Sequence, residues 1–141
     1  MKKKIAILGS TGSIGKSLLN IVKKNKNDFE IILLTANKNY KELLKQTINF
    51  KVNNVIITDL NCYLKFKKIN TNKKLKIFSN FKHLNKIFKS KIDYVMSSII
   101  GLNGLSPTIK IIKHTNTIAI ANKESIICGW NLIDKELKKN K

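Results

Sequence analysis

Short apolar runs alternate with longer amphipathic segments along the whole chain. The apolar runs have the length of buried strands and cover residues 4–9, 30–36, 54–58, 75–78, 93–100 and 117–121. The amphipathic segments have helical spacing and cover residues 13–24, 40–50, 62–68, 81–88, 106–114 and 122–138. Strands that alternate with helices form βαβ units. The pattern therefore predicts one domain over residues 1–141 with a doubly wound α/β fold, a mainly parallel sheet and helices on both faces.

Local signals refine two of the predicted helices. Ser106 followed by Pro107 is a favourable helix start, because serine caps free N–H groups and proline needs no partner in the first turn. The last helix carries an apolar stripe that we expect to pack in the core, formed by Ile126, Trp130, Ile133 and Leu137. The two histidines, His83 and His114, have no partner at an informative spacing, so we expect them at the surface or at helix ends.

The segment after the first predicted strand is the sharpest local signal. Gly9, Gly12 and Gly15 have G-x-x-G-x-x-G spacing between this strand and the first helix. In a dinucleotide-binding turn the first glycine permits the tight turn, the second lets a pyrophosphate approach, and the third allows close helix packing. Free N–H groups at the helix start favour phosphates, and Thr11 and Ser13 add hydroxyl donors. The context predicts a Rossmann-like dinucleotide site, with a structural turn that binds nothing as the alternative.

The end of the second predicted strand distinguishes between the nicotinamide cofactors. NAD-binding domains usually place an acidic residue there to bind the ribose 2′-OH. This chain has TANKN at residues 35–39, without a carboxylate that would repel a 2′-phosphate. Lys38 supplies a cation for that phosphate, so the sequence favours NADP(H). The alternative is that Lys38 is one more exposed residue among 28 basic ones.

Polar residues also follow two later strands. Ser97 and Ser98 end one predicted strand, and the triplet Asn122-Lys123-Glu124 follows the next. Ligands of open α/β sheets lie beyond the carboxyl ends of strands, so these residues are expected to face the same crevice as the glycine turn. The triplet is equally compatible with the ordinary chemistry of a helix N-terminus. No acidic residues have metal-ligand spacing, so no metal site is predicted within this chain.

The strongly basic composition of the chain indicates nucleic-acid binding as another possible class of function. The chain has a formal net charge of +20, and all its basic residues are lysine. Such a balance is typical of nucleic-acid-binding proteins. The lysines are spread along the chain, however, and arginine, which makes bidentate contacts to bases and phosphates, is missing. We therefore expect solvated lysine faces, a weak salt-sensitive attraction to polyanions and no specific nucleic acid.

No apolar run approaches membrane-spanning length, and the run behind the basic start is too short for a signal peptide. We therefore expect no membrane association and a cytoplasmic location.

Four motifs together resemble one enzyme family. KIAILGSTGSIG, LTANKN, SSIIGLNGLSPT and IAIANKES occur in this order over nearly the whole chain. They are similar to the N-terminal, NADPH-binding domain of 1-deoxy-D-xylulose 5-phosphate reductoisomerase. The resemblance implies an NADP-dependent oxidoreductase of isoprene biosynthesis, in which 1-deoxy-D-xylulose 5-phosphate is rearranged and then reduced to 2-C-methyl-D-erythritol 4-phosphate. The alternative is an NADP(H)-binding remnant or sensor domain without catalysis.

The resemblance also implies roles for individual residues. The cofactor-binding residues would be Gly9, Thr11, Gly12, Ser13, Ile14, Asn37, Lys38, Asn39, Asn122 and Glu124. Residues 11–14 would hold the pyrophosphate and its neighbours, and residues 37–39 would surround the 2′-phosphate. Lys123 would bind the phosphorylated sugar substrate. The family often has glycine in place of Asn37, and asparagine tolerates unusual backbone angles, so binding need not be lost.

Members of this family continue well beyond the length of this chain. Their next portion begins with metal-binding acids in an Asp-Ser-Glu motif, where magnesium or manganese acts as a Lewis acid. None of that portion lies in these 141 residues, so we expect no catalytic residue and no metal ligand here. On its own the chain is expected to bind NADPH without metal-dependent turnover. The resemblance implies a homodimer for the full-length enzyme.

Overall fold

Six parallel strands form a single sheet in the computed structural model, which describes residues 1–141. The strands are β1 (Lys3–Leu8), β2 (Phe29–Ala36), β3 (Asn54–Ile57), β4 (Lys76–Phe78), β5 (Ile92–Ser97) and β6 (Thr115–Ile120). Their order across the sheet is β4-β3-β2-β1-β5-β6, and every neighbouring pair is parallel. The predicted α/β class with a parallel sheet is therefore confirmed.

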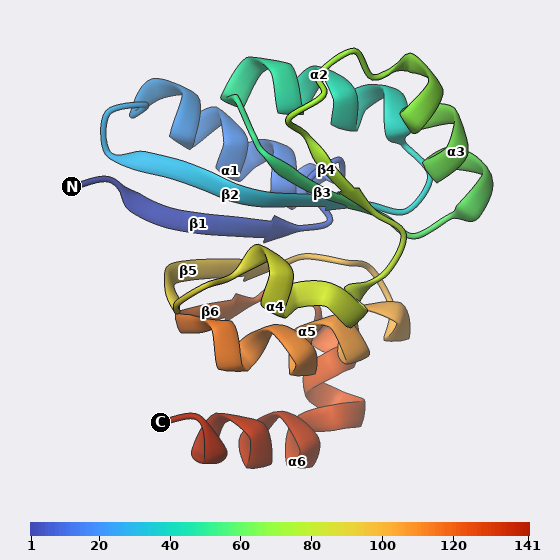
Figure 1. The fold of residues 1–141 in the computed structure, drawn as a ribbon. Helices are drawn as coiled ribbons and strands as arrows, with labels where there is room; N and C mark the ends of the chain where they lie inside the picture. Colours follow the sequence, from blue (N-terminus) through green and yellow to red (C-terminus); the bar gives the residue numbers. More distant parts are fainter.

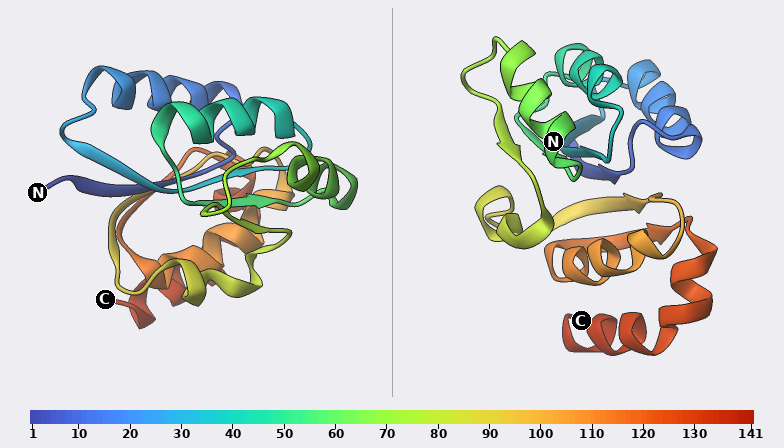
Figure 2. Two further views of the ribbon diagram at one scale, coloured as in Figure 1. Left: turned by 45° about the horizontal axis from the view of Figure 1, so that its top comes forward. Right: turned by 90° about the vertical axis from the view of Figure 1, so that its right-hand side faces the viewer.

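Helices cover both faces of this sheet, as predicted (Figures 1 and 2). The α-helices are α1 (Ser13–Lys24), α2 (Tyr40–Phe50), α3 (Leu60–Ile69), α4 (Leu84–Ile87), α5 (Leu105–Ile111) and α6 (Lys123–Lys139). The 3-10 helices are η1 (Phe81–His83), η2 (Leu102–Gly104) and η3 (Ile112–His114). Helices α1 to α3 lie on one face and α4 to α6 on the other, with α6 outermost beyond α5. None of these helices combines the length and apolar character needed to span a membrane.

The core consists of two layers, one on each face of the sheet. Ile5 and Ile7 of β1 point into the layer under α1 to α3, while Ala6 and Leu8 point into the layer under α4 and α5. These four side chains are at most 2% exposed. Burial on both faces explains why β1 is a continuous apolar run in the sequence instead of an alternating one.

Two predicted helices differ in detail from the structure. Residues 81–88 form η1 followed by the short α4, because His83 leaves the helical conformation with φ −108° and ψ 29°. The predicted cap at Ser106 is wrong. Gly104 is the N-cap of α5, because η2 ends there and leads directly into the helix. Pro107 still lies in the first turn, where its missing N–H costs nothing.

The core stripe predicted for α6 is only partly buried. Ile133 is fully buried, but Trp130 is 48% exposed. The helix packs on α5 through small residues, because an added Cβ on Gly129 would collide with the side chain of Leu105. Ser125, on the same side, is also fully buried. The apolar pattern predicted that Trp130 faces the core. In the structure Gly129 and Ser125 face α5 instead, because small residues let the two helices pack closely.

His114 is buried at the end of η3, so the predicted helix-end position is confirmed and a surface position is wrong. Its ring centroid lies 5.2 Å from that of Phe88, and its Nε2 atom has no hydrogen-bond partner. Burial, and then the charge of Lys113, lower the pKa of His114 from its ordinary value of 6.5. The folded chain therefore holds this imidazole neutral more firmly than the unfolded chain does.

Acid is expected to destabilise the fold through His114. The unfolded chain binds a proton near the ordinary pKa while the folded chain resists it, so stability is lost as the pH falls below about 6.5. The slope from one such group is at most about 1.4 kcal/mol per pH unit. Urea denaturation between pH 7.5 and 5 measures it. His114→Leu is expected to flatten this dependence, because it removes the buried imidazole. An unchanged slope in His114→Leu would contradict the assignment.

Candidate nucleotide-binding site

A cavity of about 560 Å³ opens at the carboxyl ends of the strands. It lies at the junction of β1 and β5, where the strand order reverses. Its lining includes Gly12 after β1, Ala36 at the end of β2, Thr58 after β3 and Ser98 after β5. Ligands of doubly wound sheets bind at this kind of switch point.

The three glycines of the turn after β1 differ in whether the structure requires glycine at their position. Gly9 has a φ of +80°, and a Cβ there would also lie 2.9 Å from the carbonyl oxygen of Ser98. A Cβ on Gly15 would lie 2.5 Å from the carbonyl oxygen of Gly9. The turn and packing roles predicted for Gly9 and Gly15 are confirmed. A Cβ on Gly12 would meet no heavy atom closer than 3.5 Å, so this glycine is not required by the packing of the protein itself.

The N-terminus of α1 is left open beside the cavity. Gly12 is its N-cap, no side chain caps it, and its first turn contains no acidic residue. By contrast, α2, α3 and α6 are capped by the side chains of Asn39, Asp59 and Asn122. The first N–H groups of α1 and its partial positive charge therefore remain available for an anionic ligand, and the adjoining Thr11 lines the cavity.

Ser10 fixes the glycine turn from the opposite side. Its Oγ donates to Oε1 of Gln46 at 2.7 Å, and Nε2 of Gln46 donates to the carbonyl oxygen of Ser10 at 3.0 Å. The backbone N–H of Gly9 donates to Oγ1 of Thr35 at 2.9 Å. Gln46 was not predicted as part of the site, because this support comes from α2, 36 residues away.

The residues after β2 have two different roles, since one lines the cavity and another caps helix α2. Asn37 lines the cavity, and its Nδ2 donates to Oγ1 of Thr58 at 2.8 Å. Asn39 caps α2 by accepting from the backbone N–H of Glu42 at 3.4 Å. Lys38 lies between them with an exposed side chain, outside the cavity lining. Of the residues proposed around a 2′-phosphate, Asn37 borders the cavity directly.

The structure brings a carboxylate close to Lys38 that was not predicted there. Asp59 follows β3, and its backbone N–H donates to the carbonyl oxygen of Asn37 at 3.2 Å. Its Oδ1 accepts the backbone N–H of Cys62 at 2.9 Å. Hydrogen bonds from Cys62, together with the charge of Lys38, hold the pKa of Asp59 below its ordinary value. An anion bound beside Lys38 would therefore have one cation and one carboxylate as neighbours.

The side-chain amide of Asn122 makes three hydrogen bonds within the protein. Its Nδ2 donates to the carbonyl oxygens of Ile99 and Gly101, and its Oδ1 accepts the backbone N–H of Ser125 at 3.1 Å. Ile99 and Ile100 line the cavity, so Asn122 acts on the site by fixing the loop after β5. Both amide hydrogens are therefore used within the protein, and Oδ1 keeps one lone pair that accepts no bond from the protein.

The other two residues of the triplet lie at the start of α6. Lys123 is exposed and Glu124 is half-buried, and neither belongs to the cavity lining. Ser13 and Ile14, at the start of α1, also lie outside that lining. The structure thus brings together Gly9, Thr11, Gly12 and Asn37 of the predicted site residues. The others lie at the neighbouring helix starts.

Several residues of the cavity were not predicted. These are Thr58, Phe81, Ile99, Ile100, Asn103 and Pro107. Thr58 ends a predicted strand, and the same reasoning that selected Ser98 would have found it. Phe81 comes from η1, and no local sequence signal places it at this end of the sheet.

No group of three or more histidine, cysteine, aspartate or glutamate side chains that could hold a metal ion comes together in the structure. The acids that follow strands are engaged otherwise, since Asp59 caps α3 and Glu124 lies in the first turn of α6. The residues of this chain therefore do not fit a magnesium or manganese ion.

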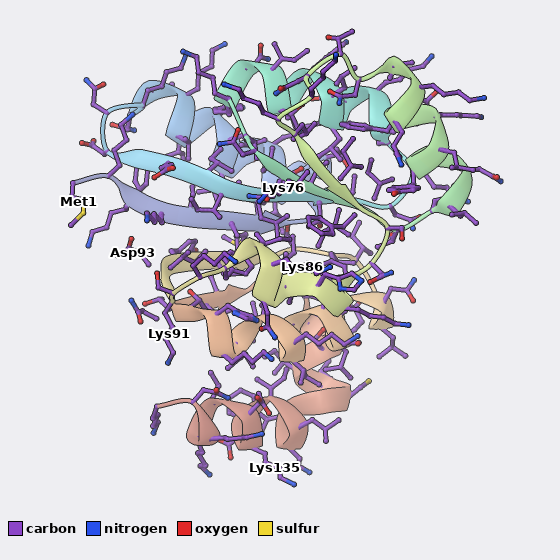
Figure 3. The ribbon with its side chains drawn as sticks, in the orientation of Figure 1. Met1, Lys76, Lys86, Lys91, Asp93 and Lys135 are labelled. Carbon is purple, nitrogen blue, oxygen red and sulfur yellow. The ribbon has the colours of Figure 1, made fainter.

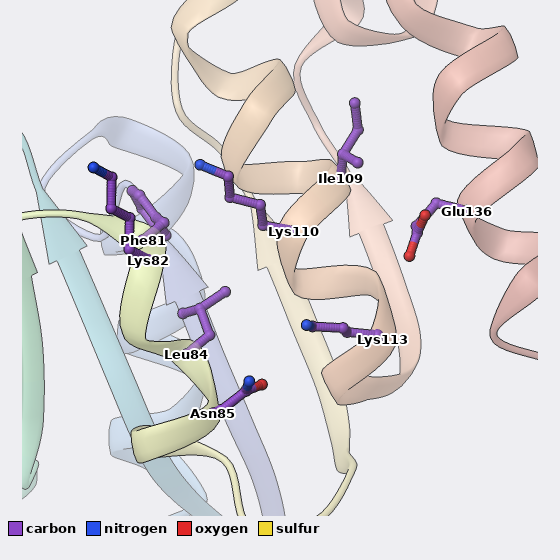
Figure 4. Close-up of a pocket in the computed structure, with 8 residues that line it drawn as sticks. All are labelled: Phe81, Lys82, Leu84, Asn85, Ile109, Lys110, Lys113 and Glu136. Carbon is purple, nitrogen blue, oxygen red and sulfur yellow. The ribbon is translucent and has the colours of Figure 1, made fainter.

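A second hollow of about 360 Å³ lies between η1, α4 and α5 (Figure 4). Lys82, Lys110 and Lys113 border it, and Glu136 of α6 faces it from the other side. It lacks a glycine turn and an open helix N-terminus, so it has no rigid backbone donors for a phosphate. Lysines occur along the whole chain, and Figure 3 labels four of them on different segments, Lys76, Lys86, Lys91 and Lys135. The basic border of this hollow follows from that distribution.

A sequence model of 1-deoxy-D-xylulose 5-phosphate reductoisomerase matches residues 5–129. This chain belongs to that family. The resemblance carried by the four motifs is therefore confirmed, and the match runs from β1 into α6.

Individual members of the family align with almost the whole of this chain. The reductoisomerase of Pelagibacter ubique (strain HTCC1062) is 62% identical over 99% of this chain, and that of Clostridium kluyveri is 41% identical over 99%. A solved reductoisomerase from Zymomonas mobilis in complex with NADPH superimposes with a TM-score of 0.89 at 28% identity over 99% of this chain. A second one, in complex with NADPH, fosmidomycin and magnesium, gives 0.86 at 31% identity over 98%. The chain spans 34% to 37% of the length of these proteins.

Proposed function

We propose that this chain is the NADPH-binding domain of a 1-deoxy-D-xylulose 5-phosphate reductoisomerase. The observation that carries the proposal is the open N-terminus of α1 beside the glycine turn, at the switch-point cavity. Two solved members of the family in complex with NADPH support it. The whole enzyme would rearrange and reduce 1-deoxy-D-xylulose 5-phosphate in the cytoplasm as a homodimer. Its magnesium or manganese ligands would come from outside this chain.

Each part of the site has a separate task in this proposal. NADPH supplies a hydride when bound. Gly12 leaves room for the pyrophosphate, the N–H groups of Ser13 and Ile14 donate to it, and Thr11 adds a hydroxyl donor. Asn122 fixes the loop that walls the cavity opposite the glycine turn.

The remaining residues lie at the borders of the cavity. Asn37, Lys38 and Asn39 surround the 2′-phosphate, with Lys38 as its counter-charge. Lys123 extends from the start of α6 to the sugar phosphate substrate, and Glu124 contacts the cofactor from the same turn. These assignments follow the order of the strand ends and the family motifs.

Lys38→Ala is expected to reduce the preference for NADPH over NADH about fivefold, which corresponds to about 1 kcal/mol for hydrogen bonds to a charged group. The affinity for NADH itself should change little, because only the 2′-phosphate distinguishes the two cofactors. Calorimetric titration of both cofactors at physiological salt measures the effect.

Asp59→Asn provides a matched variant with the opposite expected sign. Asparagine caps a helix as well as aspartate does, so α3 should remain intact. The change removes the negative charge beside Lys38 and should therefore raise the preference for NADPH. If both variants keep the ratio of the unmodified chain, the 2′-phosphate does not bind between these residues.

A further inference from the structure

Helix α6 carries large apolar side chains that the structure leaves uncovered. Ile126, Ile127 and Trp130 are 36%, 78% and 48% exposed. Their spacing of three and four residues places them on one side of the helix. We call these three side chains the α6 flank.

The orientation of α6 is fixed, so the flank cannot turn inward. Asn122 ties the start of the helix to the loop at residues 99–101, and Gly129 packs against Leu105. Rotating α6 to bury Trp130 would expose Ile133, which is now fully buried. The exposed flank is therefore a property of the packed structure.

An exposed patch with this composition indicates a surface that binds another polypeptide. A single exposed isoleucine, such as Ile48 on α2, is ordinary on a protein surface. The α6 flank instead groups two isoleucines around a tryptophan, a residue type enriched in the centres of interfaces. It lies on the outermost helix of its face of the sheet (Figures 1 and 2), and all three of its side chains are exposed.

We infer that the α6 flank docks the polypeptide that continues beyond the matched segment in the longer members of the family. This chain accounts for only 36% to 37% of the length of its curated relatives, so most of each relative lies outside the match. The relatives align over 99% of this chain, which includes the whole of α6. The family motifs imply that its longer members continue after this domain, so their next portion would begin at the end of the helix that carries the flank. The inference rests on the proposed function only in that it takes this chain as part of a larger enzyme.

Charge argues against a second copy of this chain as the occupant. Each copy carries a net charge of +20, so two copies would repel each other across the flank. A complementary surface needs an apolar centre, and its rim would meet charges of both signs, because Lys123 and Glu124 both lie in the first turn of α6. Docking there also brings the added portion next to Lys123, at the start of α6 near the nucleotide cavity.

Trp130 is the only tryptophan of the chain and reports on the flank directly. The test joins this chain to the portion of the Pelagibacter ubique relative that follows the matched segment. Any tryptophan in the added portion is replaced by phenylalanine, so that the fluorescence comes from Trp130 alone. Docking should reduce the quenching of Trp130 by acrylamide by about threefold or more relative to the 141-residue chain, as expected for a side chain in the dry centre of an interface. NADPH titration of the same samples tests the cofactor site separately.

Two isoleucines provide a matched pair of variants. Ile127→Asp places a charge in the flank and should restore the accessibility of Trp130 in the joined protein. Ile48→Asp makes the same change at a comparably exposed position on α2 and should leave Trp130 shielded. Shielding that survives Ile127→Asp would overturn the inference, as would equal quenching in the joined and separate proteins. Shielding in the 141-residue chain alone, with doubling of its mass at high concentration, would overturn it by assigning the flank to a second copy.

The complete Pelagibacter ubique protein gives a measurement that does not depend on the joined protein. Amide hydrogen exchange in its segment aligned with residues 123–139 should be slower than in its isolated N-terminal domain. Equal exchange in the two forms would also overturn the inference.

Discussion

Gly15→Ala is expected to destabilise the chain by about 3 kcal/mol, at the upper end of the usual cost of overpacking. Alanine inside a helix normally gains up to about 1 kcal/mol over glycine, so helix propensity alone predicts the opposite sign. The loss arises because the new Cβ would lie 2.5 Å from the carbonyl oxygen of Gly9 and from Cα of Ser10, both backbone atoms that cannot rotate away. Urea denaturation measures the change, and a variant at least as stable as the parent chain would show that α1 does not pack as described.

Gly12→Ala is expected to separate cofactor binding from stability. The Cβ would meet only the carbonyl oxygen of Gly9, at 3.5 Å, so the fold should lose no more than about 1 kcal/mol, the cost of a poorer N-cap. The same methyl group occupies the space through which a pyrophosphate approaches the backbone, and affinity for NADPH should fall at least about tenfold. Calorimetric titration and urea denaturation on one preparation give both values.

The two glycine variants serve as each other's controls, because Gly12 and Gly15 lie one turn apart at the start of α1. Loss of NADPH binding in Gly12→Ala without loss of stability, and loss of stability in Gly15→Ala, form the expected pattern. The reverse pattern would contradict the roles assigned to the two positions.

Local sequence signals were sufficient for the glycine turn and for the start of α6. The turn combines a buried strand, three glycines and an amphipathic helix, all within residues 3–24, so no distant contact is needed to specify it. Asn122 was recognised at the start of the last helix, where asparagine is a favourable N-cap. The parallel sheet followed from the alternation of strands and helices alone.

Features that depend on contacts between distant segments were not predictable in this way. Gln46 supports Ser10 across 36 residues, and Asp59 approaches Lys38 only because β3 lies beside β2. In α6 the apolar pattern selected Trp130 for the core, although Gly129 permits the closer approach to Leu105. Hydrophobicity ranks side chains by transfer free energy, whereas helix packing also depends on how closely two backbones approach.

A preference for NADPH over NADH is the property that the glycine turn and the segment after β2 should confer together. Calorimetric titration of the unmodified 141-residue chain with each cofactor, at physiological salt, tests it most directly. Moderate salt matters because a chain with a net charge of +20 attracts any polyanion weakly at low salt. We expect one site per chain and tighter binding of NADPH than of NADH. Equal affinities for the two cofactors, or no saturable binding of NADPH at physiological salt, would contradict the proposed function of the site.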